Sequence, residues 1–131
     1  MKQLKRILHV EDVPSIQVVT RIALEKLGGF EVLSCQSGQA ALDQVQAFAP
    51  DLILLDVMLP QMDGIETTAF IRSELDGAMR DVPVLGLTAN VNPQDLERFK
   101  AAGLNDVLLK PFDPVQLCTQ IEALILKRRS V

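Results

Sequence analysis

Short apolar runs recur along the chain, and longer segments with helical periodicity separate them. The runs occupy residues 6–10, 30–35, 52–55, 84–87 and 107–109. Such an alternation predicts an α/β domain with a parallel sheet. Residues 52–55 are all Leu or Ile, as expected for a central strand covered by helices on both faces.

The segments between the runs carry apolar stripes at helical spacing. The first stripe is Ile16, Val19, Ala23 and Leu27, and we expect the following Gly28 to end that helix in a left-handed conformation. A second stripe is Ala41, Val45 and Phe48, and the last is Leu117, Ile121, Leu124 and Ile125. Together with the runs, these stripes predict five strand-helix units.

Three further helix starts are indicated by capping residues. Asp63 precedes Glu66 at capping-box spacing, while Asn92 and Asp113 each stand directly before a proline. We find no repeat, linker or low-complexity segment. The organisation predicted is one domain over residues 1–131, with a core at about residues 5–127.

Composition excludes several classes of function. With 13 Lys and Arg against 17 Asp and Glu, the formal charge is −4, which disfavours direct nucleic-acid binding. No apolar run is long enough for a membrane span, and charged residues follow the N-terminus too closely for a signal peptide. Cys35 and Cys118 belong to no metal-binding or redox motif, so we expect reduced structural thiols and a cytoplasmic protein.

Polar residues follow or end the predicted strands. Because ligands of open α/β sheets bind beyond the carboxyl ends of the strands, these residues should converge on one edge. Three carboxylates would repel one another there unless a hard cation joined them, and oxygen ligands favour Mg²⁺, with Mn²⁺ as an alternative. With an ammonium and a hydroxyl nearby, the site suits a phosphoryl group. The residues concerned are Glu11, Asp12, Asp56, Thr88 and Lys110.

In these segments the chain resembles the receiver domains of two-component response regulators, the chemotaxis regulators among them. The resemblance covers nearly the whole chain, and the matching segments are residues 7–12, 51–60, 62–64, 87–90, 102–103 and 110–112. It implies a doubly wound, flavodoxin-like (βα)5 fold with strand order 2-1-3-4-5. It also implies a switch that accepts a phosphoryl group and changes its partner-binding surface, not a conventional enzyme.

The resemblance also assigns roles to individual residues. Asp56 would be the phosphoacceptor, Thr88 the hydroxyl that moves toward the phosphoryl group, and Lys110 the lysine that contacts it. The metal would bind Asp12, Asp56 and the main-chain carbonyl of Met58 directly, and Glu11 through water. The bond from Lys110 to Pro111 is expected to be cis.

Two departures from the family pattern concern switching and turnover. Val107 replaces the aromatic residue whose rotation often accompanies activation, so coupling would run through Thr88 and through movement of a loop or helix. The resemblance implies that Met58 and Asn90 flank the entry for attacking water, and neither is a carboxylate. We therefore expect slow to moderate self-dephosphorylation.

The partners implied are a histidine kinase or histidine phosphotransfer protein as donor, and a downstream protein at the surface of the fourth helix, last strand and last helix. The chain would act alone, as its Met1 start favours, or belong to a larger hybrid kinase.

One alternative function is a phosphorylation-independent interaction module of the same fold. Another is a small aspartyl-phosphate phosphatase, which would need an acid where Met58 stands. We interpret His9 as a packed or hydrogen-bonded strand residue, not a phosphohistidine.

Overall fold

The computed structural model describes residues 4–57, 63–89, 92–110 and 112–129. Five parallel strands form one sheet in the order β2-β1-β3-β4-β5, the flavodoxin-like order expected. The strands are β1 (Arg6–Val10), β2 (Glu31–Cys35), β3 (Leu52–Asp56), β4 (Val84–Thr88) and β5 (Asp106–Leu109). Each lies within one residue of its predicted run.

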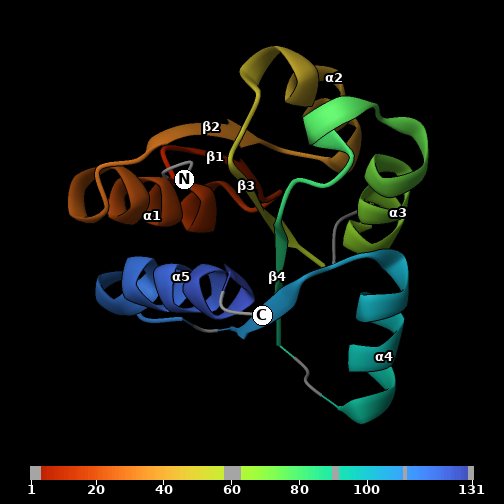
Figure 1. Cartoon of the computed structure of the whole chain (residues 1–131). Coiled ribbons are helices and arrows are strands. Elements are labelled where there is room, and N and C mark those ends of the chain that lie inside the picture. The colour runs from red at the N-terminus through yellow and green to blue at the C-terminus, as the bar shows by residue number, and fades with distance from the viewer. Residues whose placement is uncertain (1–3, 58–62, 90–91, 111, 130–131) are drawn as a thin grey trace.

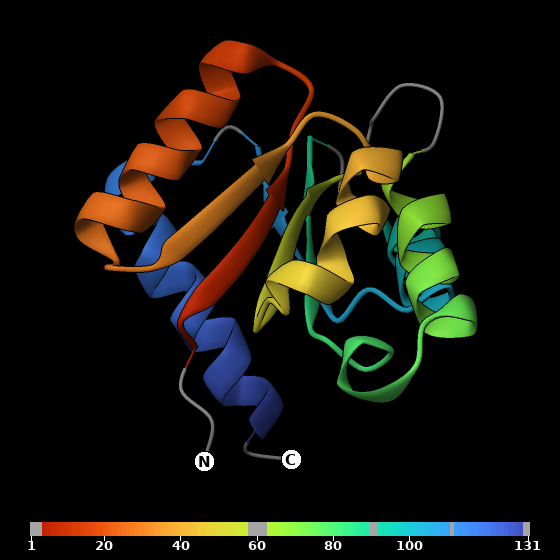
Figure 2. The ribbon, with the colours of Figure 1, turned by 90° about the horizontal axis from the view of Figure 1, so that it is seen from above.

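Helices cover both faces of the sheet (Figure 1). They are α1 (Pro14–Ile22) with a following π-helical turn η1 (Ala23–Leu27), α2 (Gly38–Phe48), α3 (Gly64–Glu74), the 3-10 turn η2 (Gly77–Met79), α4 (Pro93–Ala102) and α5 (Pro114–Arg129). Figure 2 shows α1 and α5 on one side of the sheet and α2, α3 and α4 on the other. The fold therefore has three layers.

The strand sequences explain the two cores. Successive side chains of a strand point to opposite faces, so Ile7 packs toward η1 and α5 while Leu8 packs toward α2 and α3. All five residues of β3 are buried, as predicted for the central strand. The predicted stripes of α2 and α5 also face these cores, with Ala41, Val45, Leu117 and Ile121 buried.

The predicted stripe of α1 is partly wrong. Val19 is 48% exposed and Leu27 is 60% exposed, while Thr20, Ala23 and Leu24 are buried. The π-helical turn starts at Ala23 and adds a residue to the turn, so the buried side shifts there and leaves Leu27 at the surface. Val19 precedes that turn, and with Ile16 it lines an apolar cavity at the surface.

The glycine prediction after this helix is displaced by one residue. Gly28 is right-handed, and Gly29 adopts the left-handed conformation with φ of 70°. Gly28 is required for space instead: a Cβ there would lie 2.6 Å from Cys118 Sγ and 2.6 Å from the Phe30 ring. Close approach of η1 to α5 therefore explains this glycine.

The predicted caps are confirmed. Asp63 Oδ1 accepts from Glu66 N at 2.8 Å, Asn92 Oδ1 accepts from Asp95 N at 2.8 Å, and Asp113 Oδ1 accepts from Val115 N at 2.9 Å. These caps start α3, α4 and α5.

Cys35 and Cys118 are buried free thiols, and burial raises the pKa of both. Among the described helices, none has the length and apolar character needed to cross a membrane.

Candidate functional site

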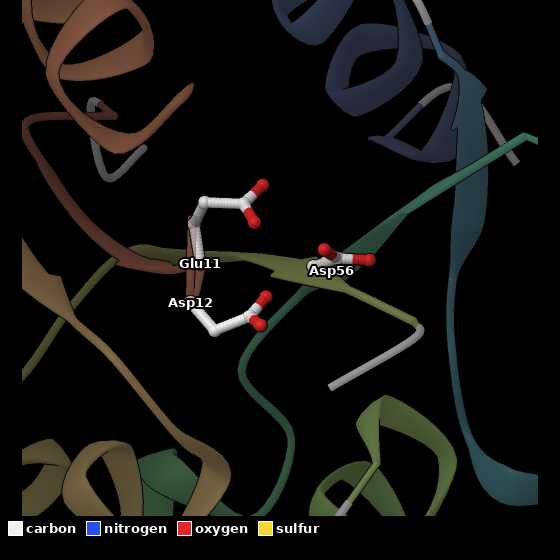
Figure 3. A group of neighbouring side chains, drawn as sticks. All are labelled: Glu11, Asp12 and Asp56. Atoms are coloured by element: carbon white, nitrogen blue, oxygen red, sulfur yellow. The ribbon is translucent and has the colours of Figure 1, made fainter. Parts of the chain in front are cut away.

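Carboxylates from the ends of two neighbouring strands converge at one edge of the sheet. The parallel register pairs Val10 with Leu55, so Glu11 follows β1 at the level where Asp56 ends β3. Glu11, Asp12 and Asp56 each place an oxygen within 4.8 Å of the others. Figure 3 shows the Glu11 and Asp12 side chains extending from the end of β1 toward the side of Asp56.

Lys110 places an ammonium group among these carboxylates. Its Nζ lies 2.9 Å from Asp56 Oδ2 and 3.3 Å from Glu11 Oε1. The Glu11 side chain is fully buried and that of Asp56 is only 7% exposed, so both ion pairs lie in a weakly solvated setting. The four residues together carry three negative charges and one positive charge when all are ionised.

The pKa values of Glu11 and Lys110 reflect the close packing of these charges. Burial and the negative charge of Asp56 raise the pKa of the Glu11 carboxyl. Burial alone would lower the pKa of the Lys110 ammonium, but its hydrogen bond to Asp56 and the charges of Asp56 and Glu11 outweigh burial and raise it. Lys110 is therefore held as a cation, and the excess of negative charge favours a further cation.

Thr88 lies at the end of the next strand. It ends β4, beside β3, and its residue surface is only 5% exposed. Lys110 N donates to Thr88 O at 2.8 Å, which fixes the main chain of the two residues relative to each other. The structure thus brings Glu11, Asp12, Asp56 and Lys110 together and places Thr88 at the adjoining strand end.

Three residues of the expected site lie outside the described residues. They are Met58, whose carbonyl was the expected third direct metal ligand, Asn90, and Pro111 with its peptide bond to Lys110. The described donors still fit Mg²⁺, which prefers carboxylate oxygens and keeps several waters. A hard cation among Glu11, Asp12 and Asp56 would relieve their mutual repulsion.

His9 is buried but not hydrogen-bonded. Among the described atoms, neither ring nitrogen of His9 has a hydrogen-bond partner, although the side chain is fully buried between β2 and β3. Burial and the positive charge of Lys110 lower its pKa to about 4, despite the opposing charge of Asp56. The interpretation of His9 as a packed or hydrogen-bonded strand residue is confirmed, and of the two forms the structure shows the packed one. A fully buried ring cannot be reached by a phosphoryl donor.

Sequence reasoning missed Gln17. Its side-chain Nε2 donates to Glu11 O at 3.1 Å and to Cys35 O at 3.2 Å, which ties α1 to the ends of β1 and β2. No motif marks this glutamine, because its acceptors are main-chain carbonyls. Only its place one turn into α1, directly after the acidic pair, hints at such a contact.

Comparison with known proteins decides the family. The model of the response regulator receiver domain matches residues 7–122. The chain belongs to this family. Receiver domains are phosphorylation switches of two-component systems, with a histidine kinase as the partner that the family implies, and are not conventional enzymes.

Curated relatives place this receiver beside longer proteins. The chain is 33% identical over 119 residues to the CAI-1 autoinducer sensor kinase/phosphatase CqsS of Vibrio cholerae, covering 91% of this chain and 17% of that protein. It is 36% identical over 121 residues to the phosphate regulon transcriptional regulatory protein PhoB of Escherichia coli, covering 92% of this chain and 52% of PhoB. The chain therefore spans about half of this regulator and a smaller part of the kinase.

Solved structures agree with the fold. The chemotaxis response regulator CheY4 of Vibrio cholerae superposes with a TM-score of 0.84 at 29% identity, over 93% of this chain and 99% of CheY4. The receiver domain of sensor histidine kinase PA1611 from Pseudomonas aeruginosa superposes with a TM-score of 0.80 at 36% identity, over 94% and 98% of the two chains. That receiver holds a magnesium ion in its active-site cleft. In this chain, Glu11, Asp12 and Asp56 supply carboxylate oxygens, which are the ligands that Mg²⁺ prefers.

Proposed function

We propose that this chain, as one receiver domain over residues 1–131, accepts a phosphoryl group on Asp56. The observation that carries the assignment is the convergence of Asp56, Lys110 and the Glu11-Asp12 pair at one sheet edge. Asp12 and Asp56 would bind Mg²⁺ directly, with the Met58 carbonyl, and Glu11 would act through water. Mn²⁺ would bind the same oxygen ligands.

The chemistry of the site follows from its charges. An Asp56 carboxylate oxygen attacks phosphorus, the bond from phosphorus to the donor's imidazole nitrogen breaks, and that nitrogen regains a proton. When bound, Mg²⁺ neutralises negative charge on the phosphoryl oxygens. Lys110 does the same from the β5 side, and the Thr88 hydroxyl donates to a phosphoryl oxygen. Neutralisation rather than acid-base chemistry is the contribution of the protein.

The donor, a histidine kinase or a histidine phosphotransfer protein, would approach over α1. Val18, Val19 and Ile22 of this helix are each between 44% and 49% exposed. Beside them an apolar cavity of about 420 Å³ reaches the site, and its lining includes Ile16, Val19, Ala89, Lys110, Phe112 and Pro114. An apolar face that adjoins the acceptor would seat a donor helix with its phosphohistidine directed at Asp56.

The output surface would comprise α4, β5 and α5. Leu109 on β5 is 55% exposed and Val115 on α5 is 71% exposed. Val107 replaces an aromatic residue on β5, so a movement of Thr88 would be passed on through α4. Phe99 is the single fully packed side chain among the described residues of α4. A helix held by so few buried contacts can shift at small cost. We place the protein in the cytoplasm, where two-component kinases phosphorylate receivers.

Intact mass after incubation with acetyl phosphate and Mg²⁺ tests the proposal. Gain of one phosphoryl group by the wild type, but not by Asp56→Asn or by wild type in EDTA, is the expected result. Circular dichroism of Asp56→Asn should show an unchanged fold. No gain by a folded, Mg²⁺-bound wild type would instead favour a phosphorylation-independent interaction module.

A further inference from the structure

The turn that carries Glu11 and Asp12 has few anchors. Glu11 N donates to Cys35 O at 2.9 Å, and Val13 N donates to Glu11 Oε2 at 3.3 Å. α1 begins directly after this turn, and its N-cap residue, Val13, makes no side-chain capping bond. The start of the helix is therefore not fixed by the usual device.

Gln17 supplies the missing anchor from inside the helix. Its main-chain N donates to Val13 O at 2.9 Å, which closes the first turn of α1. Its side-chain amide then reaches back to Glu11 O at 3.1 Å and Cys35 O at 3.2 Å. One side chain thus holds the acidic turn, the end of β2 and α1 together.

The Gln17 side chain holds the turn whose carboxylates repel one another. Adjacent carboxylates on Glu11 and Asp12 face Asp56 within 4.8 Å, so they repel one another when no metal is bound. This repulsion favours movement of the Glu11-Asp12 turn away from β3, and the Lys110 ammonium, which attracts Glu11 and Asp56, offsets only part of it. A donor on the Glu11 carbonyl opposes that displacement without adding charge to the site.

We infer that Gln17 is a positioning residue for the divalent-cation site, because its amide holds the Glu11-Asp12 turn in the geometry that the cation requires. The inference rests on the proposed Mg²⁺ site. Gln17 contacts no reacting atom; it acts through the main chain of Glu11. Removing a group that orients a metal ligand without contacting the metal typically weakens metal binding by roughly 10- to 100-fold.

Two variants of Gln17 separate positioning from other effects. Gln17→Met keeps the length of the side chain and removes both donors. Gln17→Glu also removes the donors, but it brings a negative charge toward the cation. If charge alone mattered, Gln17→Glu would bind cations more tightly, whereas positioning predicts weaker binding by both variants. Gln46→Met and Gln46→Glu, at an exposed position of α2, are the matched controls.

The measurement is titration with Mn²⁺, followed by the paramagnetic resonance of the free ion, and competition by Mg²⁺. We expect Kd for both ions to rise roughly tenfold in Gln17→Met and severalfold in Gln17→Glu, with no change in the Gln46 variants. Thermal unfolding in EDTA checks that each variant is folded at the titration temperature. A Kd within twofold of wild type in a folded Gln17 variant overturns the inference.

The wild-type protein gives a readout that does not depend on any variant folding. The side-chain amide protons of Gln17 should exchange more slowly than those of Gln46 and shift when Mg²⁺ binds. Amide signals typical of free solvent, unchanged by Mg²⁺, would contradict the inference. The proposed function fails separately, if wild-type protein binds Mg²⁺ with the expected Gln17 dependence but gains no phosphoryl group from acetyl phosphate.

Discussion

The two edges of the sheet use charged residues in opposite ways. At the amino edge, Asp51 Oδ2 accepts from Lys5 N and Arg6 N, both at 2.9 Å. At the same edge, the Arg72 side chain of α3 donates to main-chain carbonyls that precede β4 and β5 and to the Asn105 side chain. The carbonyls belong to Arg80, Val82 and Gly103. At the carboxyl edge, Lys110 Nζ forms ion pairs with the carboxylates of Asp56 and Glu11.

The difference explains which edge can respond to a signal. A charge bonded to the main chain cannot change partner unless the fold opens, so it contributes to stability. Charges bonded to one another can be redistributed by a cation or a phosphoryl group while the main chain stays in place. Substitutions at the amino edge should therefore change stability, and substitutions at the carboxyl edge should change binding and phosphorylation.

The largest expected effect on stability is at the amino edge. Arg72→Ala removes five hydrogen bonds of 2.7 to 3.1 Å, including donors to Val82 O and Gly103 O. We expect unfolding free energy to fall by about 3 kcal/mol, since half-buried carbonyls lose their donors. Urea denaturation measures the change.

The lower stability of Arg72→Ala should not impair phosphorylation. Folded Arg72→Ala should gain a phosphoryl group as the wild type does. Arg98→Ala, whose side chain is 65% exposed, is the control and should change stability by less than about 0.5 kcal/mol. Equal stability of Arg72→Ala and wild type would remove the contrast between the edges.

His9 lies between the two edges and should give stability a dependence on pH. Its pKa is lowered from 6.5 to about 4 in the folded protein, so the unfolded chain binds more protons between these values. Stability from this residue is therefore present above pH 6.5 and lost as pH falls, by about 3 kcal/mol at pH 4. His9→Leu should lack this loss and be at least as stable as wild type at pH 7, because it removes two buried nitrogens without partners.

Urea denaturation of both proteins at pH 7 and at pH 4.5 checks this prediction. The carboxyl groups common to both proteins cancel in the comparison. Parallel losses of stability in wild type and His9→Leu would show that the imidazole is not the group responsible.

Two aspartates at opposite edges form a matched pair. Asp51→Ala removes the acceptor of two main-chain donors and should lower stability by about 1 to 2 kcal/mol. Asp12→Ala should change stability in EDTA little but abolish the rise in Tm that Mg²⁺ gives the wild type. Thermal scans with EDTA or Mg²⁺ test both, and a Mg²⁺-dependent Tm in Asp12→Ala would contradict the metal assignment.

The smallest effect expected is on cation affinity in Lys110→Ala. Removing the ammonium 2.9 Å from Asp56 removes a competing positive charge, so Kd for Mg²⁺ should fall severalfold. Some phosphorylation should remain, with a weaker response of partner binding. Calorimetric titration measures the affinity, and weaker Mg²⁺ binding would show that Lys110 organises the site rather than competing within it.

Much of the fold and site could be predicted from the sequence, because local patterns carried the information. The apolar run of β3 at residues 52–55 and the cap at Asp63 depend on a few adjacent residues. The convergence of Glu11 and Asp56 followed from parallel topology alone. The same topology placed Lys110 at that edge, but its ion pair with Glu11, between residues 99 positions apart, was not predicted.

The errors have physical causes. The stripe of α1 failed at Leu27 because a π-helical turn over Ala23–Leu27 changes the period, and no residue type marks such a turn. It failed at Val19 because this side chain lines a surface cavity and is not in the core. The anchors Gln17 and Arg72 were missed because they bind main-chain carbonyls, which every residue offers. The burial of both His9 ring nitrogens without a hydrogen-bond partner could not be predicted, because it depends on residues that are distant in sequence.

The most direct test locates the phosphoryl group itself. Acetyl phosphate and Mg²⁺ are added to the wild type, the acyl phosphate is reduced with borohydride, and the peptides are sequenced by mass spectrometry. The account predicts homoserine in place of aspartate at position 56, only when Mg²⁺ is present. Reduction at Asp12, or no reduced residue in a folded and Mg²⁺-bound protein, would contradict the assignment of Asp56 as the phosphoacceptor.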